Sequence, residues 1–295
     1  MFYRIKHTTL YQYSEPVTLC HNEAHLLPRS LSWQHCLETQ LHIQPKPAVS
    51  HERKDFFGNR VVYFSIEEPH LALEVTAWSE MKMHTMPPPD VQATPAWEEV
   101  RKRIESDLGR NALEARQFAL PSPFIPTTAA FAEYASVSFS AGRPVLSAVH
   151  DLTRRIFSEF TYDPASTTVA TPVSEVFAHR RGVCQDFAHF ALACLRSLGL
   201  AARYVSGYLE TAPLEGETEL IGSAASHAWV SVYCPDLGWV DFDPTNDLIP
   251  SDRHIVVAWG RDYSDVAPLK GTILGGGDPE LKVGVEVKKV ENDAP

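Results

Sequence analysis

Three residues in the second half of the chain could together perform nucleophilic catalysis: Cys184, His227 and Asp243. A thiolate can attack a carbonyl carbon, an imidazole can carry the proton, and a carboxylate can orient the imidazole. The alternative interpretations are a small buried cysteine, an ordinary strand histidine and an aspartate that caps a turn in Asp-Pro-Thr. Spacing alone leaves both interpretations open.

The cysteine falls at the start of the most strongly patterned stretch of the chain, Arg181–Gly199. Six apolar residues there recur at the spacing of one helical stripe: Phe187, Phe190, Ala191, Cys194, Leu195 and Leu198. The pattern predicts a central, largely buried helix that begins near Cys184 and ends at Gly199. The free N–H groups and positive dipole end of such a helix favour a thiolate over a thiol.

A predicted β-hairpin carries the other two residues. Residues 226–233 alternate as a strand, Pro235–Gly238 reads as the turn, and residues 239–244 return as the second strand. His227 and Asp243 share parity, so they can point to the same face of the hairpin. For His227 and Asp243 to lie directly opposite each other, the turn must be centred near Pro235. The sequence pattern places the turn one or two residues later, so we expect a bulge or a skewed pairing.

Composition limits the possible classes of protein. The 295 residues predict two domains, and 26 basic against 37 acidic residues give a net charge of −11. That acidity argues against nucleic acid and anionic membranes as partners. We expect a cytoplasmic protein, because the N-terminus lacks the apolar core of a signal peptide and no run approaches a membrane span. Five scattered cysteines without C-x-x-C spacing predict neither a disulfide framework nor a zinc site.

The change in periodicity along the chain predicts the domain organisation. Short strands with turn signals indicate an antiparallel β-sandwich over residues 1–86, followed by a proline-rich linker over residues 87–95. Residues 96–260 predict a helical lead-in and an α+β catalytic core. Residues 261–295 predict a C-terminal strand and tail, with the strand packing on either the core or the sandwich.

Four segments in order resemble the core of the transglutaminase-like superfamily: R-G-V-C-Q-D-F-A, L-G-L-A-A-R-Y-V-S-G-Y, S-H-A-W-V-S-V-Y and G-W-V-D-F-D-P-T-N. They lie within roughly residues 145–250. H-T-T-L-Y-Q-Y-S-E-P-V, H-L-L-P-R and G-R-D-Y-S-D-V-A-P-L-K-G resemble segments outside the core in bacterial members. The resemblance implies a papain-like α+β fold, with Cys184 as nucleophile, His227 as general base and acid, and Asp243 as the orienting carboxylate.

Two features of the animal members of the family have no match here. Their oxyanion-stabilising tryptophan has no counterpart upstream of Cys184; Tyr162 is a candidate replacement donor, and a buried tyrosine with a satisfied hydroxyl is the alternative. Their calcium sites are also not recognisable. We therefore expect neither a metal nor a cofactor.

The residues and the resemblance together predict a cysteine-dependent hydrolase of peptide, amide or isopeptide bonds. The alternatives are a transglutaminase, in which an amine resolves the thioester, and a non-catalytic peptide-binding module. A peptide or protein is the expected partner, and the oligomeric state is open. Trp229, Trp239 and Tyr208 could line a substrate groove or pack in the core. The acidic segment Glu210–Glu219 could attract a cationic amine or simply be solvated.

Overall fold

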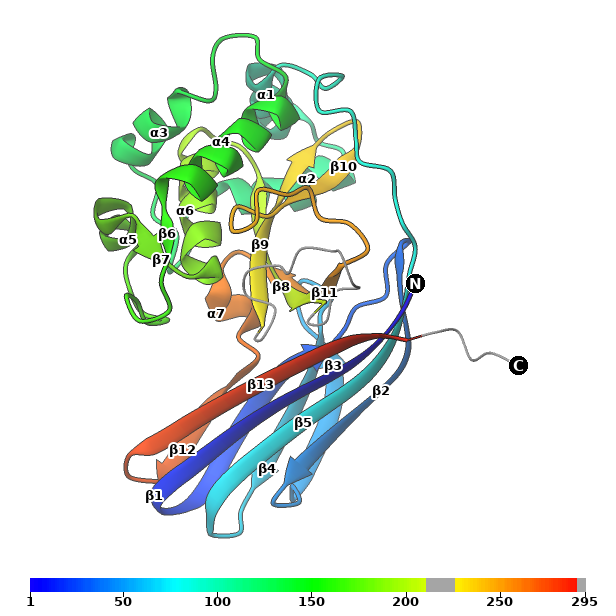
Figure 1. The fold of residues 1–295 in the computed structure, drawn as a ribbon, viewed down its shortest axis with the longest axis vertical. Helices are drawn as coiled ribbons and strands as arrows, with labels where there is room; N and C mark the ends of the chain where they lie inside the picture. Colours follow the sequence, from blue (N-terminus) through cyan, green and yellow to red (C-terminus); the bar gives the residue numbers. More distant parts are fainter. Residues whose placement is uncertain (211–225, 291–295) are drawn as a thin grey trace.

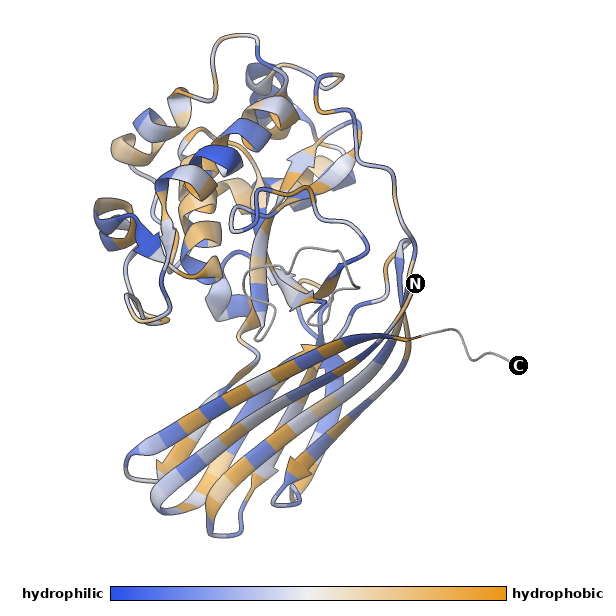
Figure 2. Ribbon diagram, viewed as in Figure 1, coloured by the Kyte–Doolittle hydropathy of each residue, from blue (hydrophilic) through white to orange (hydrophobic). Residues whose placement is uncertain are grey.

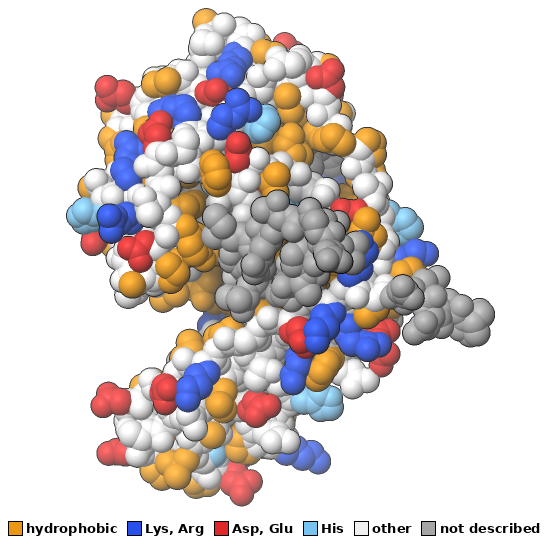
Figure 3. Space-filling model, viewed as in Figure 1, with side chains coloured by type: hydrophobic (Ala, Val, Ile, Leu, Met, Phe, Trp, Pro, Cys, Tyr) orange, Lys and Arg blue, Asp and Glu red, His pale blue; other side chains and the backbone are white. Residues whose placement is uncertain are grey.

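The computed structural model describes residues 1–210 and 226–290. It consists of two lobes joined by a narrower region (Figures 1 and 3). The lower lobe is built of strands only, and the upper lobe combines helices with a small sheet. The acidic segment singled out in the sequence lies almost entirely outside the described residues. Within the described part of the chain, no helix is long and apolar enough to cross a membrane.

The β lobe is one antiparallel sheet folded into two layers. Its strands are β1 (Phe2–Leu27), β2 (Gln34–Gln44), β3 (Val49–Lys54), β4 (Arg60–Ile66), β5 (His70–Met83), β12 (Leu269–Gly275) and β13 (Pro279–Val290). The first half of β1 pairs with β5 and β13, and its second half pairs with β4 and β12. The register shifts between Gln12 and Val17, where β1 turns from one layer into the other.

Apolar side chains from both layers form the core of this lobe. Ten buried residues make it up: Tyr13, Val17, Cys20, Ala24, Leu26, Phe64, Ile66, Leu73, Val75 and Ala77. Hydrophobic and hydrophilic residues alternate along the strands (Figure 2), as expected where one face of each strand is buried. The predicted antiparallel β-sandwich is therefore confirmed.

Both ends of the described chain contribute to this lobe. The strand expected near the C-terminus is β13, and it pairs with β1 from Phe2↔Val290 to Tyr13↔Pro279. The adjacent strand β12 was not predicted, since most of its side chains are exposed and give little alternation. Residues 269–290 therefore belong with the N-terminal domain and are not a separate tail.

The upper lobe contains the helices α1 (Trp97–Ser106), α2 (Arg110–Arg116), α3 (Ala129–Ser136), α4 (Val145–Glu159), α5 (Val173–His179), α6 (Cys184–Ser197) and α7 (Tyr263–Val266), with a 3-10 turn η1 (Gln117–Ala119). Its strands are β6 (Thr161–Tyr162), β7 (Arg181–Gly182), β8 (Ala202–Leu209), β9 (His227–Cys234), β10 (Gly238–Phe242) and β11 (His254–Gly260). The last four form an antiparallel sheet in the order β10-β9-β8-β11.

The predicted central helix is α6, and it begins at Cys184 as expected. Every residue from Asp186 to Arg196 is buried, because the helix packs against β8 and β9 on one side and against α3, α4 and α5 elsewhere. A rigid, enclosed helix fixes the position of its first residue. The helical lead-in predicted before this helix contains α1, α2, α3 and α4.

Two buried amides of the β lobe fasten the edge strand β11. Gln34 Nε2 donates to the carbonyl of Val256 at 2.7 Å, and Gln34 Oε1 accepts from the N–H of Val256 at 2.8 Å. Asn59 makes the same two-way contact with the backbone of Trp259. The amides satisfy backbone groups that a sheet edge otherwise leaves unpaired.

We expect Gln34→Leu to lower the free energy of unfolding by roughly 2–4 kcal/mol, because it leaves a buried N–H and a buried C=O without partners. Urea unfolding would measure the loss. Gln40→Leu is the matched control, since Gln40 lies exposed on the same strand and contacts Glu38 instead. Equal stability of the two variants would contradict this account of the edge strand.

Candidate active site

Cys184 occupies the first turn of α6 and is 7% exposed. The Asp186 carboxylate fixes the entry to the helix: its Oδ2 accepts from the Val183 N–H at 2.8 Å and from the Thr167 hydroxyl at 2.6 Å. Burial raises the pKa of Asp186, although these two donors oppose the shift. A Cβ at Gly182 would lie 2.6 Å from Asp186 Oδ2, so glycine is required for the carboxylate to reach its position.

His227 is the first residue of β9 and is fully enclosed. Its Nε2 lies 2.9 Å from Asp243 Oδ2, and since a carboxylate only accepts, this nitrogen carries a proton. The neutral ring then has its lone pair on Nδ1. Burial opposes protonation of the ring, but the attraction of Asp243 and Cys184 outweighs it and raises the pKa of His227 to about 10. Its Nδ1 is buried and makes no hydrogen bond to any described residue.

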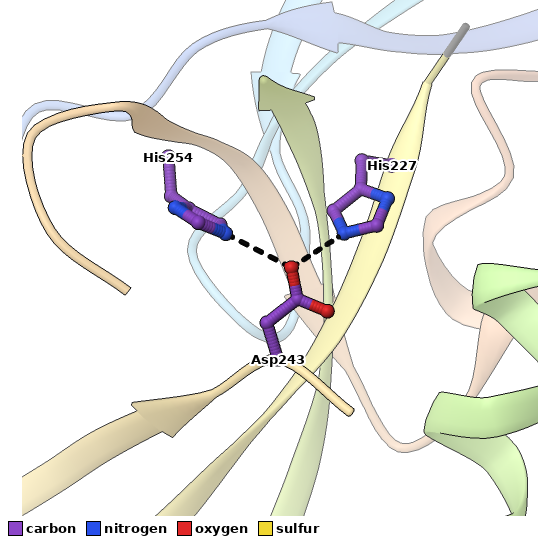
Figure 4. A group of neighbouring side chains, drawn as sticks. All are labelled: His227, Asp243 and His254. Carbon is purple, nitrogen blue, oxygen red and sulfur yellow. Dashed lines mark hydrogen bonds and ion pairs between the residues drawn. The ribbon is translucent and has the colours of Figure 1, made fainter. Parts of the chain in front are cut away.

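Asp243 follows β10 and is completely buried. Its Oδ1 accepts from the Thr245 N–H at 2.9 Å, and its Oδ2 accepts from Asn246 Nδ2 at 2.8 Å as well as from His227. A further donor to Oδ2 is His254 Nε2 at 3.0 Å (Figure 4). Burial alone would raise the pKa of Asp243, yet the two histidines hold it well below its usual value. The carboxylate is therefore ionised and held in one orientation.

The β9–β10 hairpin pairs regularly from Gly238↔Cys234 to Phe242↔Val230. Its turn is centred one residue beyond Pro235, as the sequence suggested, and of the two expected alternatives, a bulge or a skewed pairing, the described register shows the skewed pairing. Asp243 is consequently displaced diagonally from His227 along the same face. The chain turns back through the bridge between Asp243 and Leu248, which brings the carboxylate to the imidazole.

His254 is the residue of this cluster that sequence reasoning missed. It is the first residue of β11, as His227 is of β9, and both strands run antiparallel to β8 between them. Their first residues therefore lie at the same end of the sheet. A histidine opening each of two alternating apolar segments, His-Ala-Trp-Val and His-Ile-Val-Val, was the available signal.

His227, Asp243 and His254 place three donor atoms within 4.8 Å of one another, a grouping that could hold a metal ion. Both imidazole Nε2 atoms, however, already share a carboxylate oxygen as hydrogen-bond acceptor. The Nδ1 atom of each histidine is buried and has no hydrogen-bond partner within the described part of the chain.

Tyr162, the candidate oxyanion donor, lies beside the cysteine. Its backbone pairs with Gly182, two residues before Cys184, and its ring contacts Phe187. Burial, followed by the negative charges of Cys184 and Asp186, raises the pKa of Tyr162 to about 12. The hydroxyl is therefore a proton-bearing group near Cys184, and donation to an oxyanion stays a prediction.

The three groove candidates lie in different surroundings. Trp229 is wholly buried with Nε1 on Asp241, and Tyr208 is buried with its hydroxyl on His7 Nδ1. Neither presents exposed surface here, so a substrate-lining role for either stays untested. Trp239 lines a groove of about 480 Å³ walled by the linker residues 86–89 and by Trp33. Among the described residues, the groove lining includes His254 but neither Cys184 nor His227.

Two polar segments near the site have structural contacts. His189 is buried on α6, and its Nε2 accepts from the Tyr263 N–H. Arg261 pairs with Asp265, and Asp262 caps α7 while accepting from the Phe124 N–H. The segment Arg261–Tyr263 thus fastens the end of β11 to α6.

Stability should fall as the pH decreases from about 6.5 towards 4. Burial lowers the pKa of His7 and of His189 to about 4, so over this range the unfolded chain binds protons that the folded chain does not. Each group contributes on the order of 3 kcal/mol across this window. We expect His189→Gln, which keeps an acceptor for Tyr263, to flatten the pH dependence of urea unfolding. A pH dependence identical to that of the wild type would contradict the assignment.

Comparisons with known proteins match both lobes. Residues 3–82 match the model of the bacterial transglutaminase-like N-terminal region, and residues 134–244 match that of the transglutaminase-like superfamily. The uncharacterized protein Rv2569c of Mycobacterium tuberculosis is 42% identical over 300 residues, covering 99% of this chain and 94% of that protein. This chain belongs to the transglutaminase-like superfamily.

Two further proteins extend the comparison. A crystal structure of a protein from Cytophaga hutchinsonii, described as a candidate cysteine protease, has a TM-score of 0.78 at 22% identity; the match covers 100% of this chain and 92% of the other. It shows the same fold. A protein-glutamine gamma-glutamyltransferase of Pseudomonas aeruginosa is 29% identical over 131 residues, which are 40% of this chain and 20% of that protein. The predicted α+β fold and family are thus confirmed.

Proposed function

We propose that this protein is a cysteine-dependent hydrolase of peptide, amide or isopeptide bonds, with Cys184, His227 and Asp243 as its catalytic triad. One observation carries the proposal: Asp243 binds Nε2 of His227, which leaves Nδ1 as the nitrogen available to the Cys184 thiol. A nucleophile on a helix N-terminus, a base and an orienting group then form a connected series.

The reaction proceeds through a thioester. Proton transfer from Cys184 to His227 gives the thiolate, which bonds to the substrate carbonyl carbon. The N–H groups of the first turn of α6 have no intrahelical acceptor and can stabilise the resulting oxyanion. The imidazolium then protonates the leaving nitrogen as the C–N bond breaks. A water molecule, deprotonated by His227, attacks the thioester, and the acid product leaves with the thiol restored.

Transamidation is the second candidate, favoured by the similarity of part of the core to the glutamyltransferase of Pseudomonas aeruginosa. An amine must then compete with water for the thioester, which requires a sheltered route for the amine. Of the three aromatic residues considered for such a shelter, Trp229 and Tyr208 are buried and form no exposed walls. The third, Trp239, lines a groove whose described lining does not include Cys184. Hydrolysis is therefore the preferred outcome. A peptide-binding module without turnover would have no use for the three-residue series.

Glutamine- and isopeptide-containing peptides, incubated with the enzyme with and without a primary amine at millimolar concentration, would test the proposal by mass spectrometry. Release of acid and amine in both samples supports hydrolysis. A dominant amine adduct would instead establish a transamidase. Binding without any product, and unchanged by Cys184→Ala, would identify a binding module.

A further inference from the structure

We propose that His254 is a second histidine of the triad, a positioning residue that acts through Asp243 and moderates the proton affinity of His227. This inference rests on the proposed function, because it concerns how the same catalytic pair is tuned. It also gives the β lobe a part in the reaction, since that lobe holds the strand on which His254 lies.

The two histidines compete for one oxygen atom. His227 Nε2 and His254 Nε2 lie 2.9 and 3.0 Å from Asp243 Oδ2, and their ring centroids are 6.2 Å apart (Figure 4). Asn246 Nδ2 donates to the same oxygen. Each further donor withdraws charge from the carboxylate, so the carboxylate stabilises the His227 imidazolium less than it would with His227 as its only imidazole partner.

The surroundings of His254 hold its ring in place. The side chain is only 3% exposed, and Trp229 packs edge-on against it at 5.3 Å between centroids. Gly207, which pairs with His227 on β8, leaves room for the Trp229 ring in this position, because a Cβ at Gly207 would lie 2.4 Å from that ring. Two residues along β11, Gln34 of the β lobe binds both backbone groups of Val256. The ring is therefore anchored from both lobes.

Several described elements contribute ionisable groups near this pair. Cys184 on α6 acts on His227, while Asp241 on β10 accepts from the Trp229 indole that contacts His254. Glu210, after β8, is paired with Arg253, the residue preceding His254. These groups are unchanged by a substitution of His254 itself. A change in the titration of His227 on that substitution is thus attributable to the shared carboxylate.

Removing the donor from His254 should make Asp243 a stronger partner for His227. The imidazolium then persists to higher pH and is a weaker acid towards the leaving nitrogen. We expect His254→Phe, which keeps a ring against Trp229, to move the alkaline limb of the kcat/KM profile upward by about one pH unit. The kcat value near neutral pH should fall about tenfold with little change in KM.

The conservative variant His254→Gln separates this role from packing. Its amide nitrogen can donate to Asp243 Oδ2, so the alkaline limb should stay within a few tenths of a unit of wild type even if the melting temperature falls. The pH dependence of Cys184 alkylation by iodoacetamide gives a second readout without substrate. The same upward shift should appear in His254→Phe and be absent in His254→Gln.

The outcomes distinguish the two proposals. If the alkylation rate of the wild-type enzyme depends on pH as that of an isolated thiol does, with no sign of a paired imidazole, the triad itself is refuted. The wild-type profile can instead indicate a cysteine paired with an imidazole. If His254→Phe then leaves this profile unchanged or moves it to lower pH, the role of His254 is refuted and the triad is retained. Equal upward shifts in both variants would likewise exclude hydrogen bonding to Asp243 as the cause. Zinc bound stoichiometrically by wild type and lost in both variants would replace the proposal with a metal site.

Discussion

Cys184→Ala should abolish turnover and covalent labelling while leaving the fold intact. The side chain is small, sits on the first turn of α6 and supplies the protein atom that bonds to the substrate carbon in the proposed reaction. We expect kcat to fall by about 10⁴-fold or more, to the level that binding and oxyanion stabilisation alone provide. Peptide hydrolysis and labelling by an iodoacetamide probe, with circular dichroism as a check of folding, would measure this.

Cys36→Ala is the matched control for that experiment. Cys36 is half-buried on β2, and burial raises the pKa of its thiol, so it should react slowly with the probe. The control variant should keep both activity and the label on Cys184. Loss of label in Cys36→Ala, with full label in Cys184→Ala, would show that the nucleophile has been assigned to the wrong residue.

Asp243→Asn should lower kcat by roughly 10²–10⁴-fold, less than the loss of the thiol. Both histidines present Nε2–H groups to Oδ2, where an amide NH₂ cannot accept. If the amide instead turns its oxygen to the histidines, its NH₂ faces the Thr245 N–H that Oδ1 accepts. His227 then loses its preferred tautomer and the charge that stabilises its protonated form. Steady-state kinetics across pH 5–9 would report the change.

Asp241→Asn provides the comparison, because Asp241 lies two residues earlier on the same strand and accepts from the Trp229 indole. An asparagine oxygen can keep that bond, so activity should change little. If kcat falls by comparable factors in the two variants, the hairpin tolerates an asparagine at neither position. The orienting role of Asp243 then has no support. A greater loss in Asp243→Asn than in Cys184→Ala would reverse the assigned roles.

The sequence was informative wherever periodicity and local turn chemistry determine structure. The stripe that starts at Phe187 predicted α6 and placed Cys184 on its first turn. The shared parity of His227 and Asp243 placed both on one face of the hairpin. Parity cannot show the path of the chain after β10. The chain folds back there, with a bridge between Asp243 and Leu248, and this brings the Asp243 carboxylate to His227, which is not directly opposite it in the hairpin. Contacts of this kind depend on the loop and not on the strand pattern.

Long-range pairing was the part that sequence reasoning could not supply. His254 reaches Asp243 only because β8 separates β9 from β11 in the sheet, and strand order is not encoded in alternation. Likewise, the strand predicted near the C-terminus came without a partner, and the structure pairs it with β1. The contacts of Gln34 and Asn59 with β11 also join segments that lie far apart in the chain.

The pairing of β1 with strands from both ends of the chain has a consequence for how the protein is made. During synthesis, β1 emerges before the entire upper lobe, whereas its partners β12 and β13 emerge only after it. Until then one side of β1 is an open, partly apolar edge, which is a template for unwanted pairing with other chains. The nascent protein therefore depends on prompt folding of the upper lobe, after which β12 and β13 can pair with the open edge of β1.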